Sequence, residues 1–121
     1  MRCRVTIHER SVGDVTVIDI GGRMTIDEGA DVFGQVSRHL VRQGRWQLVL
    51  NLGDVPYIDS TALGEIIQAL TSVMRRDGSL TLLGVTARVH QLLVITKLLR
   101  VFDVFETETD AVRSFASIEP R

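Results

Sequence analysis

Hydrophobic residues along the chain follow two periods, and the change from one to the other predicts the order of strands and helices. Short runs rich in Val, Ile and Leu predict buried strands, whereas apolar residues that recur every three or four positions predict helices. Strands are expected at Val5–Ile7, Val15–Ile20, Gln47–Leu52, Leu80–Gly84 and Val101–Phe105. Helices are expected at about Glu28–Gln43, at Val85–Leu99 and at Thr109–Ser117, and one more follows Asp59 and Ser60 and runs to about Arg76. This order predicts an α/β fold, with a mixed four- to five-stranded β-sheet and about four helices packed mainly on one face.

A short polar turn separates the third predicted strand from the second predicted helix. Gly53, Asp54 and Pro56 end the strand. Asp59 and Ser60 follow, and both are residue types that accept hydrogen bonds at helix N-termini. From spacing alone, the simplest interpretation is that Ser60 caps the helix.

The loop after the second predicted strand contains two apolar residues. Thr25 or Asp27 is expected to cap the helix that follows. Met24 and Ile26 either staple the loop to that helix or belong to an exposed contact patch. Functional loops gather beyond the carboxyl ends of parallel strands. We therefore expect this loop and the turn at Ser60 to form one continuous surface.

Composition and charge narrow the range of functions. The 121 residues, of which 45% are hydrophobic and 24% charged, predict one globular domain over residues 1–121. With 14 basic and 15 acidic side chains the formal net charge is -1, which disfavours direct binding to nucleic acid. Apolar runs are too short to span a bilayer and the N-terminus lacks a signal core, so a cytoplasmic location without membrane insertion is expected. Cys3 is the only cysteine, and no disulfide, metal site or cofactor is expected.

Three consecutive stretches carry the most specific pattern: Leu50-Asn51-Leu52, Asp54-Val55 and Tyr57-Ile58-Asp59-Ser60-Thr61-Ala62-Leu63-Gly64. They resemble the STAS domain family, in particular the bacterial anti-sigma factor antagonists. Members of that family typically carry a hydrophobic strand, a D-S-[ST]-G-L-G turn and a helix. Ala62 stands where a glycine is usual, and Thr25 stands where many members have an aspartate.

The resemblance implies a regulatory protein that switches between partners. In that family the serine after the aspartate is the phosphorylation target, which implies Ser60, with Thr61 as the less favoured hydroxyl. The unphosphorylated form is expected to bind an anti-sigma factor with serine kinase activity and so release a sigma factor, and a phosphatase would act on Ser60. The expected partner-binding residues are Met24, Thr25, Asp59, Ser60, Thr61, Ala62, Leu63 and Ile67.

Electrostatics suggests how the switch would work. A phosphate adds about -1.5 to -2 charges at neutral pH, and a helix N-terminus can receive it. Asp54, Asp59 and Glu65 predict that the patch is already acidic. The added charge would therefore oppose a partner packed over the turn, without refolding the domain.

Other functions remain as alternatives. An enzyme would need Ser60 and Asp59 with one of three histidines, His8, His39 and His90, but no G-x-S-x-G elbow is present, so no enzyme is expected. The serious alternative is a docking module without a switch, such as the STAS subunit of an ABC-type lipid transport complex or a stress-sensing scaffold. Gly64 inside the helix is explained either by close approach of a partner or by close packing within the domain.

Overall fold

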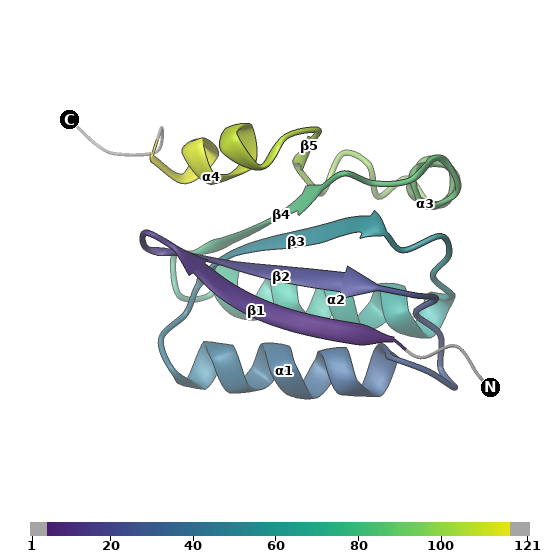
Figure 1. Ribbon diagram of the computed structural model, residues 1–121, viewed down its shortest axis with the longest axis horizontal. Coiled ribbons are helices and arrows are strands. Elements are labelled where there is room, and N and C mark those ends of the chain that lie inside the picture. The colour runs from purple at the N-terminus through teal and green to yellow at the C-terminus, as the bar shows by residue number, and fades with distance from the viewer. Residues whose placement is uncertain (1–4, 117–121) are drawn as a thin grey trace.

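The computed structural model describes residues 5–116, which form a sheet of five strands with four helices (Figure 1). The strands are β1 (Thr6–Val12), β2 (Val15–Gly21), β3 (Gln47–Asp54), β4 (Ser79–Leu83) and β5 (Val104–Phe105). The helices are α1 (Ala30–Arg42), α2 (Ser60–Met74), α3 (Ala87–Ile95) and α4 (Glu108–Ala116). The predicted order of elements is confirmed.

The strands lie in the order β1-β2-β3-β4-β5, with β3 at the centre. The hairpin β1–β2 is antiparallel, and Gly13 supplies the positive φ of 62° in its turn. β2, β3, β4 and β5 pair in parallel. Because β2 and β3 are parallel neighbours, the loops that follow them leave the sheet at the same end, beyond the carboxyl ends of the strands. The predicted site lies at this end of the sheet.

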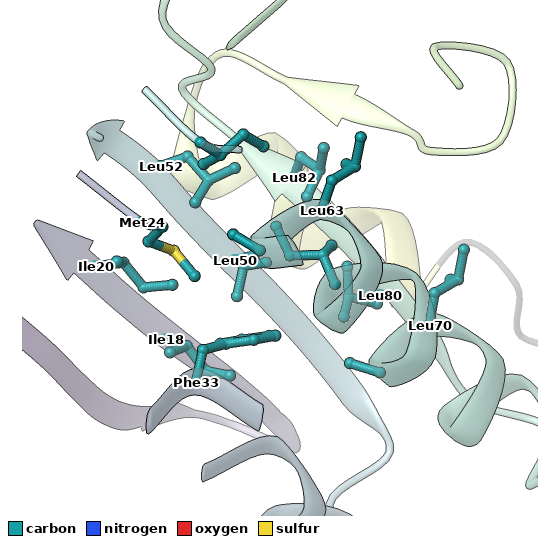
Figure 2. Close-up of a cluster of buried hydrophobic side chains, with 14 of the residues drawn as sticks. Ile18, Ile20, Met24, Phe33, Leu50, Leu52, Leu63, Leu70, Leu80 and Leu82 are labelled. Carbon is teal, nitrogen blue, oxygen red and sulfur yellow. The ribbon is translucent and has the colours of Figure 1, made fainter. Parts of the chain in front are cut away.

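Alternating side chains on the strands feed two hydrophobic clusters, one on each face of the sheet. On β3, Leu48, Leu50 and Leu52 belong to the larger cluster, whereas Val49 belongs to the smaller one. Figure 2 shows the larger cluster, in which Phe33 of α1 and Leu63 of α2 meet the strands. Helices α1, α2 and α3 contribute to this cluster, so the prediction that helices pack mainly on one face is confirmed.

Helix α4 is the exception, because it packs on the opposite face of the sheet (Figure 1). Its Ala111 and Phe115 contact the smaller cluster, together with Val17 of β2 and Val49 of β3. Valine side chains on this face of the central strands would otherwise be open to water. Covering them is what α4 contributes to the fold.

Several predicted boundaries are wrong for local reasons. β1 continues to Val12, beyond its predicted end at Ile7. The prediction stopped early because the middle of this edge strand is polar and largely exposed, so it shows no hydrophobic run. α3 ends at Ile95, and Lys97 then takes a positive φ of 63°. β5 begins only at Val104. The predicted end of the last helix, Ser117, lies outside the described residues.

The residues that cap α1 and α4 were also predicted, and the prediction for α1 is wrong. Neither Thr25 nor Asp27 caps α1, whose N-cap is Gly29 with a φ of 88°. The Thr25 hydroxyl instead accepts a hydrogen bond from the backbone N–H of Glu28 at 3.2 Å, inside the loop. For α4 the sequence offers Thr107 or Thr109 as the cap, and the structure selects Thr107, whose hydroxyl accepts from the N–H of Asp110 at 3.2 Å.

Candidate functional site

The loop after β2 and the segment before α2 are paired through their backbones. The N–H of Met24 donates to the carbonyl of Tyr57 at 3.0 Å, and the N–H of Asp59 donates to the carbonyl of Met24 at 3.1 Å. These bonds form a parallel bridge between Met24 and Ile58. A further bond joins the N–H of Gly22 to the carbonyl of Asp54 at 3.0 Å. The expectation that the two loops form one continuous surface is therefore confirmed.

Asp59 is the residue that organises this surface. It is the N-cap of α2, and its Oδ1 accepts a hydrogen bond from the N–H of Ala62 at 2.9 Å. Its Oδ2 accepts from the N–H of Ile26 at 2.8 Å, so the same carboxylate holds the neighbouring loop. Burial raises the pKa of Asp59, but the N–H donors of Ala62, Ile26 and Thr61 outweigh it and hold the pKa below its usual value. The carboxylate is thus ionised and accepts hydrogen bonds from two separate backbone segments.

Ser60 is the first residue of α2 rather than its cap, so the interpretation of Ser60 as a helix cap is wrong. Its side chain is exposed and forms no hydrogen bond within residues 5–116. Because Asp59 performs the capping, the Ser60 hydroxyl is left accessible at the positive end of the helix. Thr61 is also exposed, one position further into the helix.

Three of the expected partner-binding residues have buried side chains. Met24 and Ala62 are 0% exposed, and Leu63 is 6% exposed. Figure 2 shows Met24 and Leu63 within the larger hydrophobic cluster, where they pack with the strands. Because these side chains point into the core, they cannot also contact a partner. They instead anchor the backbone of the two loops that carry the exposed residues.

The remaining predicted residues lie at or near the surface. Thr25, Asp59 and Ile67 are partly buried, whereas Ser60 and Thr61 are exposed. The sequence left open whether Ile26 packs inward or outward, and the structure answers this, since its side chain is 66% exposed.

Gly64 lies one turn beyond Ser60 on the exposed face of α2. Apart from the neighbouring backbone of α2 itself, a Cβ atom added there would meet no atom within 4 Å. Close packing inside the domain is therefore wrong as an explanation of this glycine.

Sequence reasoning missed a cationic aromatic group beside Ser60. The guanidinium of Arg23 lies 4.9 Å from the centroid of the Tyr57 ring, and that of Arg88 lies 5.8 Å from it. Arg23 comes from the loop after β2, whereas Arg88 comes from the first turn of α3. Arg23 lies next to Met24, which the sequence had already assigned to the site, and Tyr57 belongs to the family pattern, so both could have been found in that way. No sequence signal predicts that Arg88 of α3 lies beside them.

These arginines change the expected electrostatics of the patch. Of the three acidic residues expected to dominate it, Asp59 is committed to backbone donors. Glu65 faces Arg38 of α1 at 3.6 Å. The surface around Ser60 and Tyr57 therefore combines an accessible hydroxyl and the predicted acidic residues with two guanidinium groups.

A shallow hollow of about 210 Å³ lies beside the start of α2. Ser60, Tyr57 and Arg88 line it together with apolar residues of α3 that include Leu92 and Ile95. Ile95 is 69% exposed, so the hollow opens onto an apolar part of the surface. Its shape and mixed chemistry suit contact with another protein chain.

Other kinds of site receive no support from the described part of the chain. No group of three His, Cys, Asp or Glu side chains that could hold a metal ion occurs within residues 5–116. Among the same residues, no helix is both long enough and apolar enough to cross a membrane. The three histidines lie on separate elements, β1, α1 and α3.

Comparison with known proteins agrees with this architecture. A Thermotoga neapolitana homologue of the protein TM1081 is 32% identical over 102 residues, which cover 84% of this chain and 89% of that protein. The anti-sigma-B factor antagonist of Staphylococcus epidermidis is 29% identical over 93 residues, covering 77% of this chain and 85% of that protein. The crystal structure of Thermotoga maritima TM1081 aligns with a TM-score of 0.84 at 27% identity, covering 89% of this chain and 92% of that one. The model of the STAS domain family matches residues 6–111, and the chain belongs to this family.

Proposed function

We propose that this protein is an anti-sigma factor antagonist whose partner-binding surface is the start of α2 and the loop after β2, and that phosphorylation of Ser60 switches binding off. One observation carries the proposal. Asp59 caps α2, which leaves the hydroxyl of Ser60 exposed and without a side-chain hydrogen bond in the described part of the chain. A serine needed for capping would instead be engaged with the helix.

The unphosphorylated protein binds an anti-sigma factor in the cytoplasm and so releases the sigma factor for transcription. The name of the Staphylococcus epidermidis relative supports this class of partner. The contact surface consists of the exposed side chains Ile26, Ser60 and Thr61, with the backbone at Gly64 and the partly buried Thr25 and Ile67 at its edge. Ile26 supplies apolar area, and Gly64 allows a partner to approach the helix backbone closely.

The partner also acts as the serine kinase in this proposal. The Ser60 oxygen attacks the γ-phosphorus of ATP, the bond from that phosphorus to the bridging oxygen breaks, and ADP leaves. The hydroxyl proton passes to a base of the kinase. A phosphatase reverses the change by transferring the phosphoryl group to water, which yields inorganic phosphate and restores the hydroxyl.

Phosphorylation acts on the contact rather than on the fold. The start of α2 can carry a phosphate because its free N–H groups and the helix dipole favour negative charge, by about 0.3 to 1 kcal/mol when exposed. A partner packed over the same turn would have to strip water from a group of about -1.5 to -2 charges. Binding is lost while the domain stays folded.

The test compares partner binding by wild type, Ser60→Ala and Ser60→Asp. Pull-down from the source lysate identifies the partner, and titration with that purified partner then gives the affinity. We expect wild type and Ser60→Ala to bind and Ser60→Asp to lose binding at least tenfold. Thr71→Asp is the control, because Thr71 is an exposed residue of α2 near its other end. Equal affinity of the Ser60→Ala and Ser60→Asp variants would refute the switch, and recovery of transporter subunits by all of them would favour the constitutive docking module.

A further inference from the structure

Two arginines meet on a single aromatic ring next to Ser60. Arg23 and Arg88 lie 4.9 Å and 5.8 Å from the centroid of Tyr57. Both arginine side chains are exposed, and neither forms an ion pair with another residue of the described range 5–116. The ring holds both guanidinium groups close to it without neutralising their charge. The two guanidinium groups are therefore available to bind an anion.

The position of the pair points to the anion that it would receive. Tyr57 and Arg88 line the same hollow as Ser60. The carboxylate of Asp59, which is adjacent to Ser60 in the sequence, already accepts hydrogen bonds from Ile26 and Ala62, at 2.8 Å and 2.9 Å. It is therefore directed at the backbone. A group carried by the Ser60 oxygen would extend from the start of α2 towards the hollow that Arg88 lines.

We infer that Arg23 and Arg88 form the receiving site for a phosphoryl group on Ser60, with Tyr57 as the platform that holds both guanidinium groups. This inference rests on the proposed function, because it requires that Ser60 is phosphorylated. Guanidinium groups match phosphate oxygens through paired N–H donors, and such charge-assisted hydrogen bonds are stronger than neutral ones. The phosphate is then held against the protein's own surface, and the arginines that hold it are withdrawn from any acidic group of a partner.

The test is a phosphorus NMR titration of protein that carries phosphoserine at position 60, introduced during synthesis so that no kinase is needed. The second pKa of a phosphoserine is about 6. Nearby cations favour the dianion, so we expect a lower pKa in the wild-type protein than in Arg88→Gln or Arg23→Gln, with a difference of about 0.3 to 1 unit. The double variant should show the largest increase, and 1 M salt should reduce the differences.

Controls separate the arginines from the helix. The start of α2 lowers the phosphate pKa in every variant alike, so only differences between variants report on the arginines. Arg75→Gln serves as the matched control, because Arg75 is an exposed arginine at the opposite end of α2. Arg88→Lys keeps a positive charge and should retain part of the effect. Circular dichroism should show unchanged melting, since both substituted side chains are exposed.

Either outcome of the titration is informative. A phosphate pKa that rises in the Arg23 and Arg88 variants but not in Arg75→Gln supports the receiving site. Equal pKa values in all variants overturn it, and loss of partner binding by unphosphorylated Arg88→Gln would then assign the arginine to the partner contact. The titration involves no partner, so failure of the binding switch leaves its result intact and the two proposals are tested separately.

Discussion

The carboxylate of Asp59 accepts a hydrogen bond from the backbone N–H of Ile26, 33 positions earlier in the chain, at a distance of 2.8 Å. Its other oxygen accepts from the N–H of Ala62 at 2.9 Å. One side chain therefore caps α2 and holds the loop after β2 beside Ser60. The two halves of the proposed binding surface depend on this residue for their relative position.

Replacement of Asp59 should destabilise the protein. Asp59→Ala removes a helix cap, which costs about 1 kcal/mol, and also removes the bond to the Ile26 loop. We expect the free energy of unfolding to fall by about 1 to 2 kcal/mol at pH 7, as measured by urea denaturation. Asp27→Ala, which removes an exposed carboxylate from the same loop, should change it by less than about 0.5 kcal/mol. Equal effects of the two substitutions would contradict this role.

The contribution of Asp59 should also depend on pH. Burial raises its pKa, but the backbone donors of Ala62, Ile26 and Thr61 outweigh burial and lower it below the usual value. A carboxylate whose pKa is lowered by folding stabilises the folded state above its unfolded pKa of about 3.9. That contribution is lost as the pH falls through the folded pKa. The difference between wild type and Asp59→Ala should therefore shrink between pH 5 and pH 2.5, and a constant difference would argue against an ionised cap.

Leu63→Glu should act through stability rather than through the partner contact. Leu63 is 6% exposed and lies in the larger hydrophobic cluster, so a buried carboxylate there would cost several kcal/mol. We expect a large fall in melting temperature, measured by circular dichroism. Gln68→Glu adds the same charge at an exposed position of α2 and should leave melting nearly unchanged. Unchanged melting of Leu63→Glu together with lost binding would mean that the side chain reaches the partner.

Gly64→Ala should make the isolated protein more stable. The added methyl group meets no atom within 4 Å, and alanine favours a helix over glycine by about 1 kcal/mol. We expect the free energy of unfolding to rise by about 0.5 to 1 kcal/mol in urea denaturation. Under the proposed function, the same variant should bind the anti-sigma factor more weakly, because the methyl group occupies the space of the partner. Thr71→Ala, at an exposed position of the same helix, should leave the affinity unchanged, and unaltered binding by Gly64→Ala would remove the case for close approach there.

Arg10 links the hairpin to α4, and the link should contribute little to stability. Its Nε lies 2.6 Å from Asp19 Oδ2, and its Nη2 lies 2.6 Å from Glu108 Oε1. All three side chains are roughly one third exposed, so each pair should be worth about 0.2 to 1 kcal/mol. A double-mutant cycle of Arg10→Met and Glu108→Gln should give a coupling energy in that range, with Glu106→Gln as the control.

The hydrogen bond from Arg10 lowers the pKa of Glu108 and also that of Asp19. The stability they add is therefore present above an unfolded pKa of about 4 and is lost at lower pH. A coupling energy between Arg10 and Glu108 that is the same at pH 7 and pH 3 would contradict an ionic link.

Local features of the site could be predicted from the sequence because they depend on neighbouring residues. The turn after β3, the start of α2 close to Asp59 and Ser60 and the order of elements follow from hydrophobic period and capping chemistry, which act over a few positions. Which of Asp59 and Ser60 caps the helix was not predictable from spacing, since both are good caps. The backbone angles before α2 and the bond to Ile26 decided it.

Burial at the site was less predictable, because it depends on what packs above each side chain. Met24 lies in a loop and Leu63 lies near a helix start, and both could have faced a partner. The pairing of the two loops and the packing of α2 on the sheet turn both side chains inward. Pattern alone identifies an apolar residue, but not whether the chain or a partner covers it.

By itself, the sequence determined the order of strands and helices and the family pattern around Ser60, since both arise from local chemistry. That the hydroxyl of Ser60 is left accessible was decided by the tertiary structure, because Asp59 caps the helix. Only the tertiary structure decided that α4 covers the second face of the sheet and that Arg88 joins Arg23 on Tyr57. These contacts join segments that are far apart in the chain. They follow from the order of strands in the sheet and from the crossover helices, which no local pattern encodes.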